Sequence, residues 1–347
     1  MPQENCAVIL AAGEGKRMKR NCPKVLAPVL FKPMLEWVLD SVKAAGIGRM
    51  CVVTGHLHEQ VERFLSEYDS GIHIAHQPQR RGTGHAVMMA ADFLRPNAGS
   101  SVLVLNGDSP FVGPEEIQKA YEVHRNSGNA VTVISAEPPD PSGYGRIVRD
   151  SKTGRLASIV EQKDADPKVR QIREINSGAY WFQTEDLLAI LSRIRNDNAQ
   201  GEYYLTDAVR LLIERGKRAD ACKAGSAEAV LGANDCLQLA ELNRIAREKI
   251  LTSLLLNGTD IPCSDGVIVG PDVTVGSNVS ILPGTILRGK TTLGGGCVVG
   301  PNTVLTDCTV GENTVLNSVQ CSGCAIKPGQ AVAPYTTMDK KARTDKK

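Results

Sequence analysis

The stretch that decides the fold is Cys6–Met18, which reads CAVILAAGEGKRM. Its apolar beginning, through Ala12, is typical of a strand buried on both faces of a parallel sheet. Gly13 and Gly15 then permit a tight loop, and Arg17 adds a planar guanidinium that suits phosphate oxygens. Backbone N–H groups at such a turn can bind phosphate. The pattern favours a phosphate-binding edge, although a glycine turn before a solvated basic helix has the same composition.

The same alternation of short apolar runs and helical patterns continues and predicts one α/β domain over residues 1–232. Helical periodicity covers Met34–Ala45 and Leu57–Tyr68. The expected strands are Ala7–Ala12, Met50–Thr54, Ile72–His76, Val102–Asn106 and Ala130–Ser135. Strands joined by crossover helices form a mostly parallel, Rossmann-like sheet with helices on both faces. Ligands of such sheets bind at the carboxyl ends of the strands.

A different pattern follows residue 232. Residues 233–260 predict a linker helix, because their apolar side chains fall on one helical face. Within residues 261–335 aliphatic side chains recur every six positions, at Val269, Val275, Ile281, Leu287, Leu293, Val299 and Leu305. Such a period is typical of a short parallel β-helix, here of three or four coils. The register slips by one residue near Val310, and the charged residues 336–347 are expected to be disordered.

The composition is that of an ordinary globular protein. Its 347 residues suggest two domains, and the hydrophobic and charged shares are 42% and 22%. A net charge of +2 gives no bias towards nucleic acid or a membrane surface as partner. Neither a membrane span nor a secretory signal is evident, so we expect a cytoplasmic protein. There the cysteines are mostly small apolar residues, and the lone pair Cys321 and Cys324 lacks the partners of a structural zinc site.

Further segments with recognisable motifs follow the first stretch in order. They are Pro23–Leu26 (PKVL), Gln77 with Gly82–Ala86 (GTGHA), Leu105–Asp108 (LNGD), Gly143–Arg149 (GYGRIVR), Val160–Ala165, Glu174–Gly178 (EINSG), Asn198–Asp207 and Gly232–Asp235 (GAND). With the first stretch they resemble the sugar-nucleotide pyrophosphorylases, and in particular the bacterial N-acetylglucosamine-1-phosphate uridyltransferases. The matching segments span residues 6–245.

This resemblance implies a role for each matching position. Arg17 and Lys24 would hold the triphosphate, and Asp108 and Asn234 would bind Mg²⁺, with Asn234 also next to the substrate. The uridine nucleotide would be held by Leu10, Ala11, Ala12, Gly13, Gln77, Gly82 and Thr83. Asn106 and Gly107 would border the substrates. The sugar would be contacted by Gly145, Glu161 and Asn176.

The implied chemistry agrees with these residue types. An oxygen of the sugar-1-phosphate attacks the α-phosphorus of UTP, and pyrophosphate leaves in line. Because the attacking phosphate is already an anion, the reaction needs positioning and charge neutralisation rather than a general base. Basic side chains suit the leaving pyrophosphate. Magnesium is a hard ion that takes few protein oxygens, which fits one carboxylate and one amide.

Some of these positions also have simpler interpretations. A lone aspartate at a strand end, such as Asp108, is often a turn or helix cap. His85 within GTGHA is more often structural than catalytic. Tyr203 and Tyr204 could line a sugar pocket or simply pack in the interior.

Three positions depart from the family pattern. Lys16 replaces threonine and Asn106 replaces tyrosine, and both border the nucleotide. Phe31 stands where a glycine is common. None of the three removes a charged group that the reaction needs.

The full-length relatives are bifunctional, and their long left-handed β-helix acetylates glucosamine-1-phosphate with acetyl-coenzyme A and forms trimers. No histidine follows His124 in this chain. The resemblance therefore implies a short left-handed β-helix without acetyltransferase activity, which serves as a homotrimer platform or as a cap.

The sequence thus predicts a UDP-N-acetylglucosamine pyrophosphorylase that uses UTP, a sugar-1-phosphate and Mg²⁺ to make a peptidoglycan precursor. The nearest alternative is a pyrophosphorylase for another sugar-1-phosphate, such as glucose-1-phosphate. A third possibility is a non-catalytic sensor of nucleotide sugars with the same fold.

Overall fold

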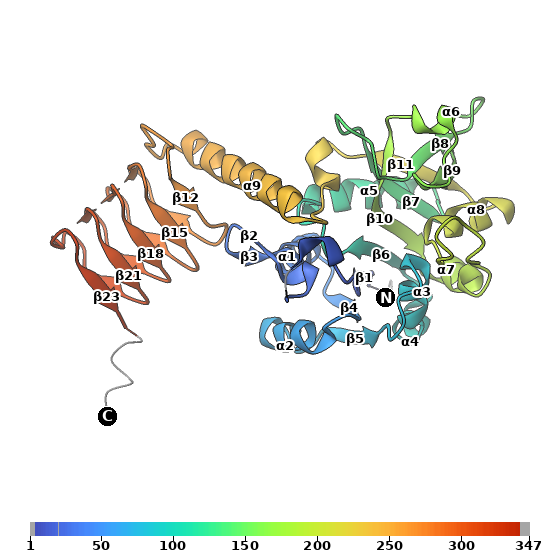
Figure 1. The fold of residues 1–347 in the computed structure, drawn as a ribbon, viewed down its shortest axis with the longest axis horizontal. Helices are drawn as coiled ribbons and strands as arrows, with labels where there is room; N and C mark the ends of the chain where they lie inside the picture. The colour runs from blue at the N-terminus through green and yellow to red at the C-terminus, as the bar shows by residue number, and fades with distance from the viewer. Residues whose placement is uncertain (1–3, 20, 341–347) are drawn as a thin grey trace. The chain divides into compact units, whose positions relative to one another are not determined.

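The computed structural model describes residues 4–19 and 21–340, except for the side chain of Lys16, and divides into two compact units (Figure 1). The first unit holds the residues up to Ala27 together with Pro33–Gln238. The second unit holds the residues from Leu239 onward and a short excursion of the early chain, Pro28–Lys32. The sequence did not predict this excursion, which carries the strand β2 (Pro28–Val29) and the first residue of its partner β3 (Lys32–Pro33).

The first unit is built on a nine-stranded sheet in the order β11-β7-β10-β6-β1-β4-β5, with β8 and β9 attached beside β10. The strands are β1 (Cys6–Ala11), β4 (Arg49–Thr54), β5 (His73–His76), β6 (Ser101–Asn106), β7 (Val131–Ala136), β8 (Arg146–Arg149), β9 (Leu156–Val160), β10 (Ile175–Gln183) and β11 (Ala219–Lys223). Strand β1 lies between β4 and β6 and is parallel to both. Strand β10 is antiparallel to β6 and β7. The mostly parallel sheet is confirmed, and β1 and β6 end at the same edge.

Helices cover both faces of this sheet. They are α1 (Met34–Ala44), α2 (His58–Tyr68), α3 (Thr83–Met89), α4 (Ala91–Leu94), α5 (Pro114–Asn126), α6 (Pro167–Arg170), α7 (Thr184–Leu191) and α8 (Thr206–Glu214), with 3-10 turns η1 (Lys16–Met18), η2 (Lys24–Leu26), η3 (Arg95–Asn97) and η4 (Ala227–Val230). Helix α5 shows why such helices form here. Proline is its first residue, and two glutamates in the first turn face the positive end of the helix dipole.

The core of the first unit has one cluster of apolar side chains on each face of the sheet. Ile9 in β1 belongs to the cluster that includes Leu39 of α1. Val8, its neighbour in sequence, belongs to the other cluster, which includes Val87 of α3. Successive side chains of a strand point to opposite faces, so an uninterrupted apolar strand requires helices on both sides.

The second unit contains most of α9 (Cys236–Leu256) and three parallel sheets made of short stacked strands. The strands are β12 (Ile268–Val269), β13 (Thr274–Val275), β14 (Ser280–Ile281), β15 (Ile286–Arg288), β16 (Thr292–Leu293), β17 (Val298–Val299), β18 (Val304–Thr306), β19 (Thr309–Val310), β20 (Val315–Leu316), β21 (Gln320–Ser322), β22 (Ala325–Ile326) and β23 (Thr337–Asp339). Leu287 pairs in register with Val269 on one side and Leu305 on the other. The inward aliphatic side chains therefore form columns, as expected of a left-handed β-helix of hexapeptide repeats.

The details of the β-helix refine the expectations from sequence. The slip of register near Val310 is confirmed, because Val310 pairs with Leu293 one residue short of the regular spacing. Strand β23 pairs with β21, so the stacked strands extend past the expected boundary at residue 335. Residues 341–347 of the expected tail lie outside the described residues.

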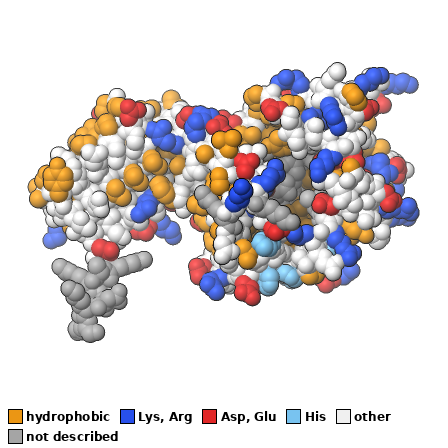
Figure 2. Space-filling model, in the orientation of Figure 1, with side chains coloured by type: hydrophobic (Ala, Val, Ile, Leu, Met, Phe, Trp, Pro, Cys, Tyr) orange, Lys and Arg blue, Asp and Glu red, His pale blue; other side chains and the backbone are white. Residues whose placement is uncertain are grey.

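The surface matches the balanced composition. On the face drawn in Figure 2, basic and acidic side chains are interspersed over both units. Within residues 4–19 and 21–340, the helices all fall short of the length and apolar character needed to cross a bilayer.

Candidate active site

A cleft at the carboxyl ends of β1 and β6 brings most of the predicted site residues together. It consists of two adjoining hollows of about 330 and 270 Å³, both within the first unit. The larger, called here the loop-side hollow, is lined by Leu10, Ala12, Gly13, Glu14, Lys24, Val25, Gln77, Arg80, Gly82, Thr83, Ala86, Asn106, Asp108 and Glu202. The smaller, called here the bulge-side hollow, is lined by Leu10, Thr83, Asn106, Asp108, Ser109, Gly143, Tyr144, Gly145, Glu161, Asn176, Ser177, Gly178, Tyr180, Leu205, Thr206, Val230, Gly232 and Asn234. The two hollows share Leu10, Thr83, Asn106 and Asp108, of which Asp108 is the charged residue.

The glycine loop after β1 brings Lys24 to this cleft. Gly15 has a φ of +64°, a conformation that L-residues with a Cβ rarely adopt. A Cβ at Gly15 would lie 2.7 Å from the Cβ of Lys24. The turn closes where the N–H of Met18 donates to the carbonyl of Gly15 at 2.8 Å. Gly15 therefore allows the chain to fold back closely against the segment that carries Lys24.

Lys24, Asp108 and Asn234 form the charged centre of the cleft. The Lys24 ammonium is paired with the Asp108 carboxylate and donates a hydrogen bond of 2.6 Å to Oδ1 of Asn234. Two hard oxygen donors thus converge on one cation. A Cβ at Gly232 would lie 2.9 Å from the carbonyl oxygen of Asp108, so glycine lets the Asn234 segment approach this closely. The donor set fits the predicted magnesium ion, which prefers carboxylate and carbonyl oxygens.

Gln77 lines the loop-side hollow. Its side chain is nearly fully buried, and its Nε2 donates to the carbonyl of Gly82 at 3.1 Å. Gly82 has a φ of +99°, and a Cβ there would lie 2.6 Å from the carbonyl oxygen of Tyr203. The Tyr203 N–H donates to the Arg81 carbonyl at 2.7 Å. The glycine-rich segment is therefore held in place by backbone bonds to the segment around Tyr203.

A bulge in β10 shapes the other hollow. The pairing of β10 with β7 shifts register between Asn176 and Ala179, within the EINSG motif. Oδ1 of Asn176 accepts from the Gly178 N–H at 2.9 Å, and its Nδ2 donates to the Tyr180 hydroxyl at 2.6 Å. Bulges often redirect side chains beside active sites. Here the bulge turns this part of an otherwise buried strand towards the cleft.

Glu161 supplies an acceptor in the bulge-side hollow. Burial raises the pKa of the Glu161 carboxyl above its ordinary value, and the Thr206 hydroxyl, which donates to it at 3.2 Å, acts in the opposite direction. A buried carboxylate with spare lone pairs can accept hydrogen bonds from the hydroxyl groups of a ligand. The hollow is therefore suited to a polyhydroxylated molecule.

Three predicted residues line neither hollow. Ala11 is buried within β1, and Arg17 is exposed on η1. Gly107 directly follows β6, and its N–H donates to the Leu10 carbonyl at 2.9 Å. The predicted contact of Arg17 with the triphosphate stays a prediction.

The structure also places residues in the cleft that the sequence did not single out. Arg80 is paired with Glu14, and both line the loop-side hollow. Tyr144 and Thr206 line the other hollow. Tyr144 and Thr206 fall within or next to motifs already quoted, so a systematic inspection of those motifs could have found them. No motif pointed to Arg80.

His85, Tyr203 and Tyr204 line neither hollow. Nδ1 of His85 lies 3.0 Å from Nε2 of Gln77, and burial lowers the pKa of His85, so the neutral ring helps to orient that amide. Tyr204 is buried, and its hydroxyl accepts from Gln200 at 2.7 Å. This arrangement agrees with the structural interpretation of these side chains.

A family model described as nucleotidyl transferase matches residues 6–230. Similar curated relatives are named bifunctional protein GlmU. The protein from Caldanaerobacter subterraneus is 43% identical over 305 residues, which are 88% of this chain and 65% of the relative. The protein from Streptomyces coelicolor is 39% identical over 94% of this chain and 68% of the relative. The chain thus spans about two thirds of the length of these relatives.

A solved structure from Bacillus anthracis, described as a candidate glucose-1-phosphate thymidylyltransferase in complex with sucrose, has a similar fold. The TM-score is 0.57 with 22% identity, over 70% of this chain and 96% of that chain. At this identity the likeness concerns the fold alone.

Proposed function

The chain belongs to the nucleotidyl transferase family, and from that membership we propose that it transfers a uridylyl group from UTP to N-acetylglucosamine-1-phosphate. The products would be UDP-N-acetylglucosamine and pyrophosphate. The observation that carries the proposal is the division of one cleft into two hollows that adjoin along shared residues, with Asp108 as the charged one among them. A nucleotide in the loop-side hollow and a sugar phosphate in the bulge-side hollow would bring their phosphates together at that residue.

The loop-side hollow suits the nucleotide. Glycine backbone and the buried amide of Gln77 offer hydrogen bonds to a base, and Lys24 and Arg80 supply positive charge for phosphates. The bulge-side hollow suits the sugar through Glu161 and the bulge at Asn176. The likeness of the GTGHA and EINSG segments to the N-acetylglucosamine-1-phosphate uridyltransferases supports that sugar over glucose.

The reaction then follows from where the charges lie. A phosphate oxygen of the sugar-1-phosphate forms a bond to the α-phosphorus, and the bond from that phosphorus to the bridging β-phosphate oxygen breaks. Lys24 neutralises charge on the phosphates as pyrophosphate leaves. Asp108 and Asn234 would hold Mg²⁺, which supplies further neutralisation when it is bound. The walls of the cleft align the two substrates, which lowers the entropic part of the barrier.

A panel of substrates tests the proposal. The purified protein is incubated with UTP, Mg²⁺ and one of several sugar-1-phosphates, and released pyrophosphate is measured. We expect the highest kcat/KM with N-acetylglucosamine-1-phosphate. Release with glucose-1-phosphate instead would establish the alternative substrate. Binding of UTP without release for any sugar would contradict the enzyme and favour the sensor.

A further inference from the structure

We propose that His58, Glu62 and His76 form a binding site for a borderline divalent transition-metal ion of the Zn²⁺ type, separate from the Asp108 centre. The three side chains come from α2 and from the end of β5. Four of the six histidines of the chain lie between residues 56 and 76. Histidine side chains are seen gathered at one place on the face of the first unit in Figure 2.

The first two ligands are already arranged by the helix. His58 and Glu62 are four residues apart on α2, so their side chains lie on the same face one turn apart. Nδ1 of His58 lies 3.1 Å from Oε1 of Glu62. Two ligands bonded to one zinc ion at about 2.0–2.2 Å stand roughly 3.4 Å apart in tetrahedral geometry. The observed spacing therefore needs little adjustment.

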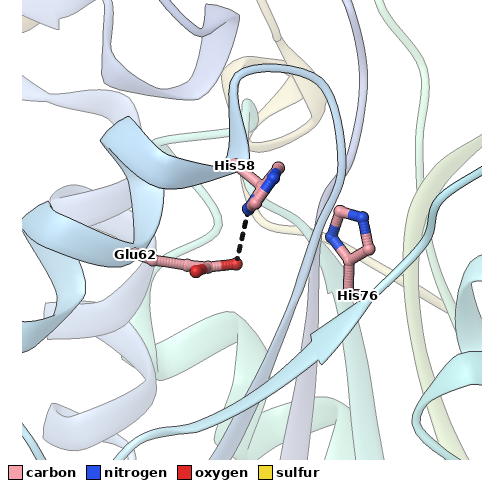
Figure 3. A group of neighbouring side chains, drawn as sticks. All are labelled: His58, Glu62 and His76. Carbon is pink, nitrogen blue, oxygen red and sulfur yellow. Dashed lines mark hydrogen bonds and ion pairs between the residues drawn. The ribbon is translucent and has the colours of Figure 1, made fainter.

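His76 provides the third ligand from β5. Its ring centroid lies 4.4 Å from that of His58 with the planes at 61°, and Figure 3 shows the His58 ring next to the Glu62 carboxylate with His76 on the neighbouring strand. One ligand atom from each of the three residues lies within 4.8 Å of the others. His76 is exposed, so a small rotation of its side chain can shorten this spacing. The site is also open to ions from solution.

The donor set determines which ions fit. Two imidazole nitrogens and one carboxylate oxygen suit Zn²⁺ and neighbouring transition metals, whereas Mg²⁺ favours oxygen ligands. Three protein ligands leave a coordination position for water or another ligand. The site therefore differs in chemistry from the pair Asp108 and Asn234.

A second layer of bonds ties these ligands to the cleft. The hydroxyl of Thr54, which is fully buried, donates to Oε1 of Glu62 at 3.0 Å. The carbonyl of Thr54 accepts from the N–H of Gln77 at 2.8 Å, and Gln77 directly follows His76. Hydrogen bonds of this kind orient metal ligands. A bound ion would thus fasten α2 to the strand end that positions Gln77.

The simpler alternative is a pair in which His58 and Glu62 only stabilise the helix, with His76 nearby. In that case the three residues together would not form a selective metal site, and replacing any one of them would not change the affinity for zinc. The alternative and the proposal therefore differ in what each substitution does to zinc affinity.

The test is a calorimetric titration with Zn²⁺ under reducing conditions in saturating Mg²⁺, which occupies the oxygen site. We expect a binding event that is weakened about tenfold or more, or lost, in His58→Ala, Glu62→Gln and His76→Ala. Glu62→Gln keeps an oxygen acceptor for Thr54 but removes the charge. Zinc should raise the Tm of the unaltered chain by more than it raises the Tm of the three variants.

His73→Ala is the matched control. His73 lies on the same strand, stacks on Phe93 and lies outside the cluster. It should bind zinc as the unaltered chain does. Zinc bound by thiols is common to all variants, so only the difference between variants counts. Equal affinity in the unaltered chain and in His76→Ala, or an equal loss in His73→Ala, would overturn the proposal.

Discussion

At the scale of single residues, two cations can occupy the same position at the centre of the cleft: the Lys24 ammonium and the proposed metal ion. The Lys24 ammonium occupies the place where Asp108 and Asn234 present their oxygens, and the proposed metal would bind the same two residues. A cation is needed there because the Asp108 carboxylate and the amide oxygen of Asn234 would otherwise repel the negatively charged phosphates. The lysine side chain is long and flexible enough to move away from these oxygens and to contact a phosphate instead.

Asp108→Ala tests the metal assignment. Since the carboxylate is the charged member of the donor pair, its loss should lower kcat by about 10²-fold or more in the presence of Mg²⁺. The fold should persist, because the Asp108 side chain is partly exposed. Pyrophosphate release and circular dichroism measure the two effects, with the exposed Asp92→Ala as control. Undiminished magnesium-dependent turnover would show that the assignment is wrong.

Glu161→Gln tests the buried carboxyl through pH. Burial raises the pKa of Glu161 in the folded state, so the folded chain holds that proton more tightly than the unfolded chain. The stabilisation is fully present below the ordinary value of 4.5 and is lost as pH rises through the folded pKa. The free energy of unfolding of the unaltered chain should therefore fall, relative to Glu161→Gln, as pH rises from about 4 to 7.

Urea denaturation of both chains at several pH values measures this difference. Glu185→Gln, at an exposed position at the start of α7, provides the control. A difference between Glu161→Gln and the unaltered chain that does not vary with pH would contradict the burial effect.

At the scale of elements, the two glycines of the loop after β1 have different roles: Gly15 serves the backbone geometry, and Gly13 serves ligand binding. Gly15→Ala should destabilise the first unit by about 1–2 kcal/mol and reduce activity, because its positive φ and its proximity to Lys24 exclude a Cβ. The Cβ added by Gly13→Ala would have no atom within 4 Å, so this substitution should leave the free energy of unfolding unchanged. It should raise the KM for UTP, since Gly13 lines the loop-side hollow. Thermal unfolding and initial rates separate the two, and a normal KM in Gly13→Ala would refute the loop as a phosphate cradle.

Strand β1 was predictable because its apolar run and the glycines after it are local properties of the chain. The excursion Pro28–Lys32 was not, because its place in the second unit depends on distant residues. Leu30, for example, donates its N–H to Asn243 at 2.9 Å. The place of Arg80 was not predictable for the same reason, since it depends on an ion pair with Glu14 from another loop. The bulge in β10 was not predictable from the sequence either, because it is defined by the pairing of β10 with β7.

At the scale of the whole molecule, the β-helix draws its stability from columns of aliphatic side chains rather than from any single coil. Leu287→Ala removes a fully buried member of one column and should cost about 2–5 kcal/mol in the second unit. Val315→Ala truncates an aliphatic residue that is 56% exposed on β20 and should cost much less. Calorimetry resolves the units if they unfold separately, and equal losses in the two variants would contradict the column.

The homotrimer stays a prediction, and so does the lack of acetyl transfer. Light scattering coupled to size-exclusion chromatography should give the mass of three chains. A mass of one chain at working concentration would contradict the trimer, and thioester cleavage of acetyl-coenzyme A by glucosamine-1-phosphate in the presence of the protein would contradict the second expectation.

The bond between Lys24 and Asn234 joins residues 210 positions apart. During synthesis at about 5–20 residues per second, Asn234 leaves the ribosome roughly 10–40 s after Lys24. Strands β1, β4 and β6 are all complete long before then, so a nascent chain can begin its sheet while the charged centre still lacks one of its members. The active site is thus completed late in synthesis, when the segment after β11 has been made and closes the cleft.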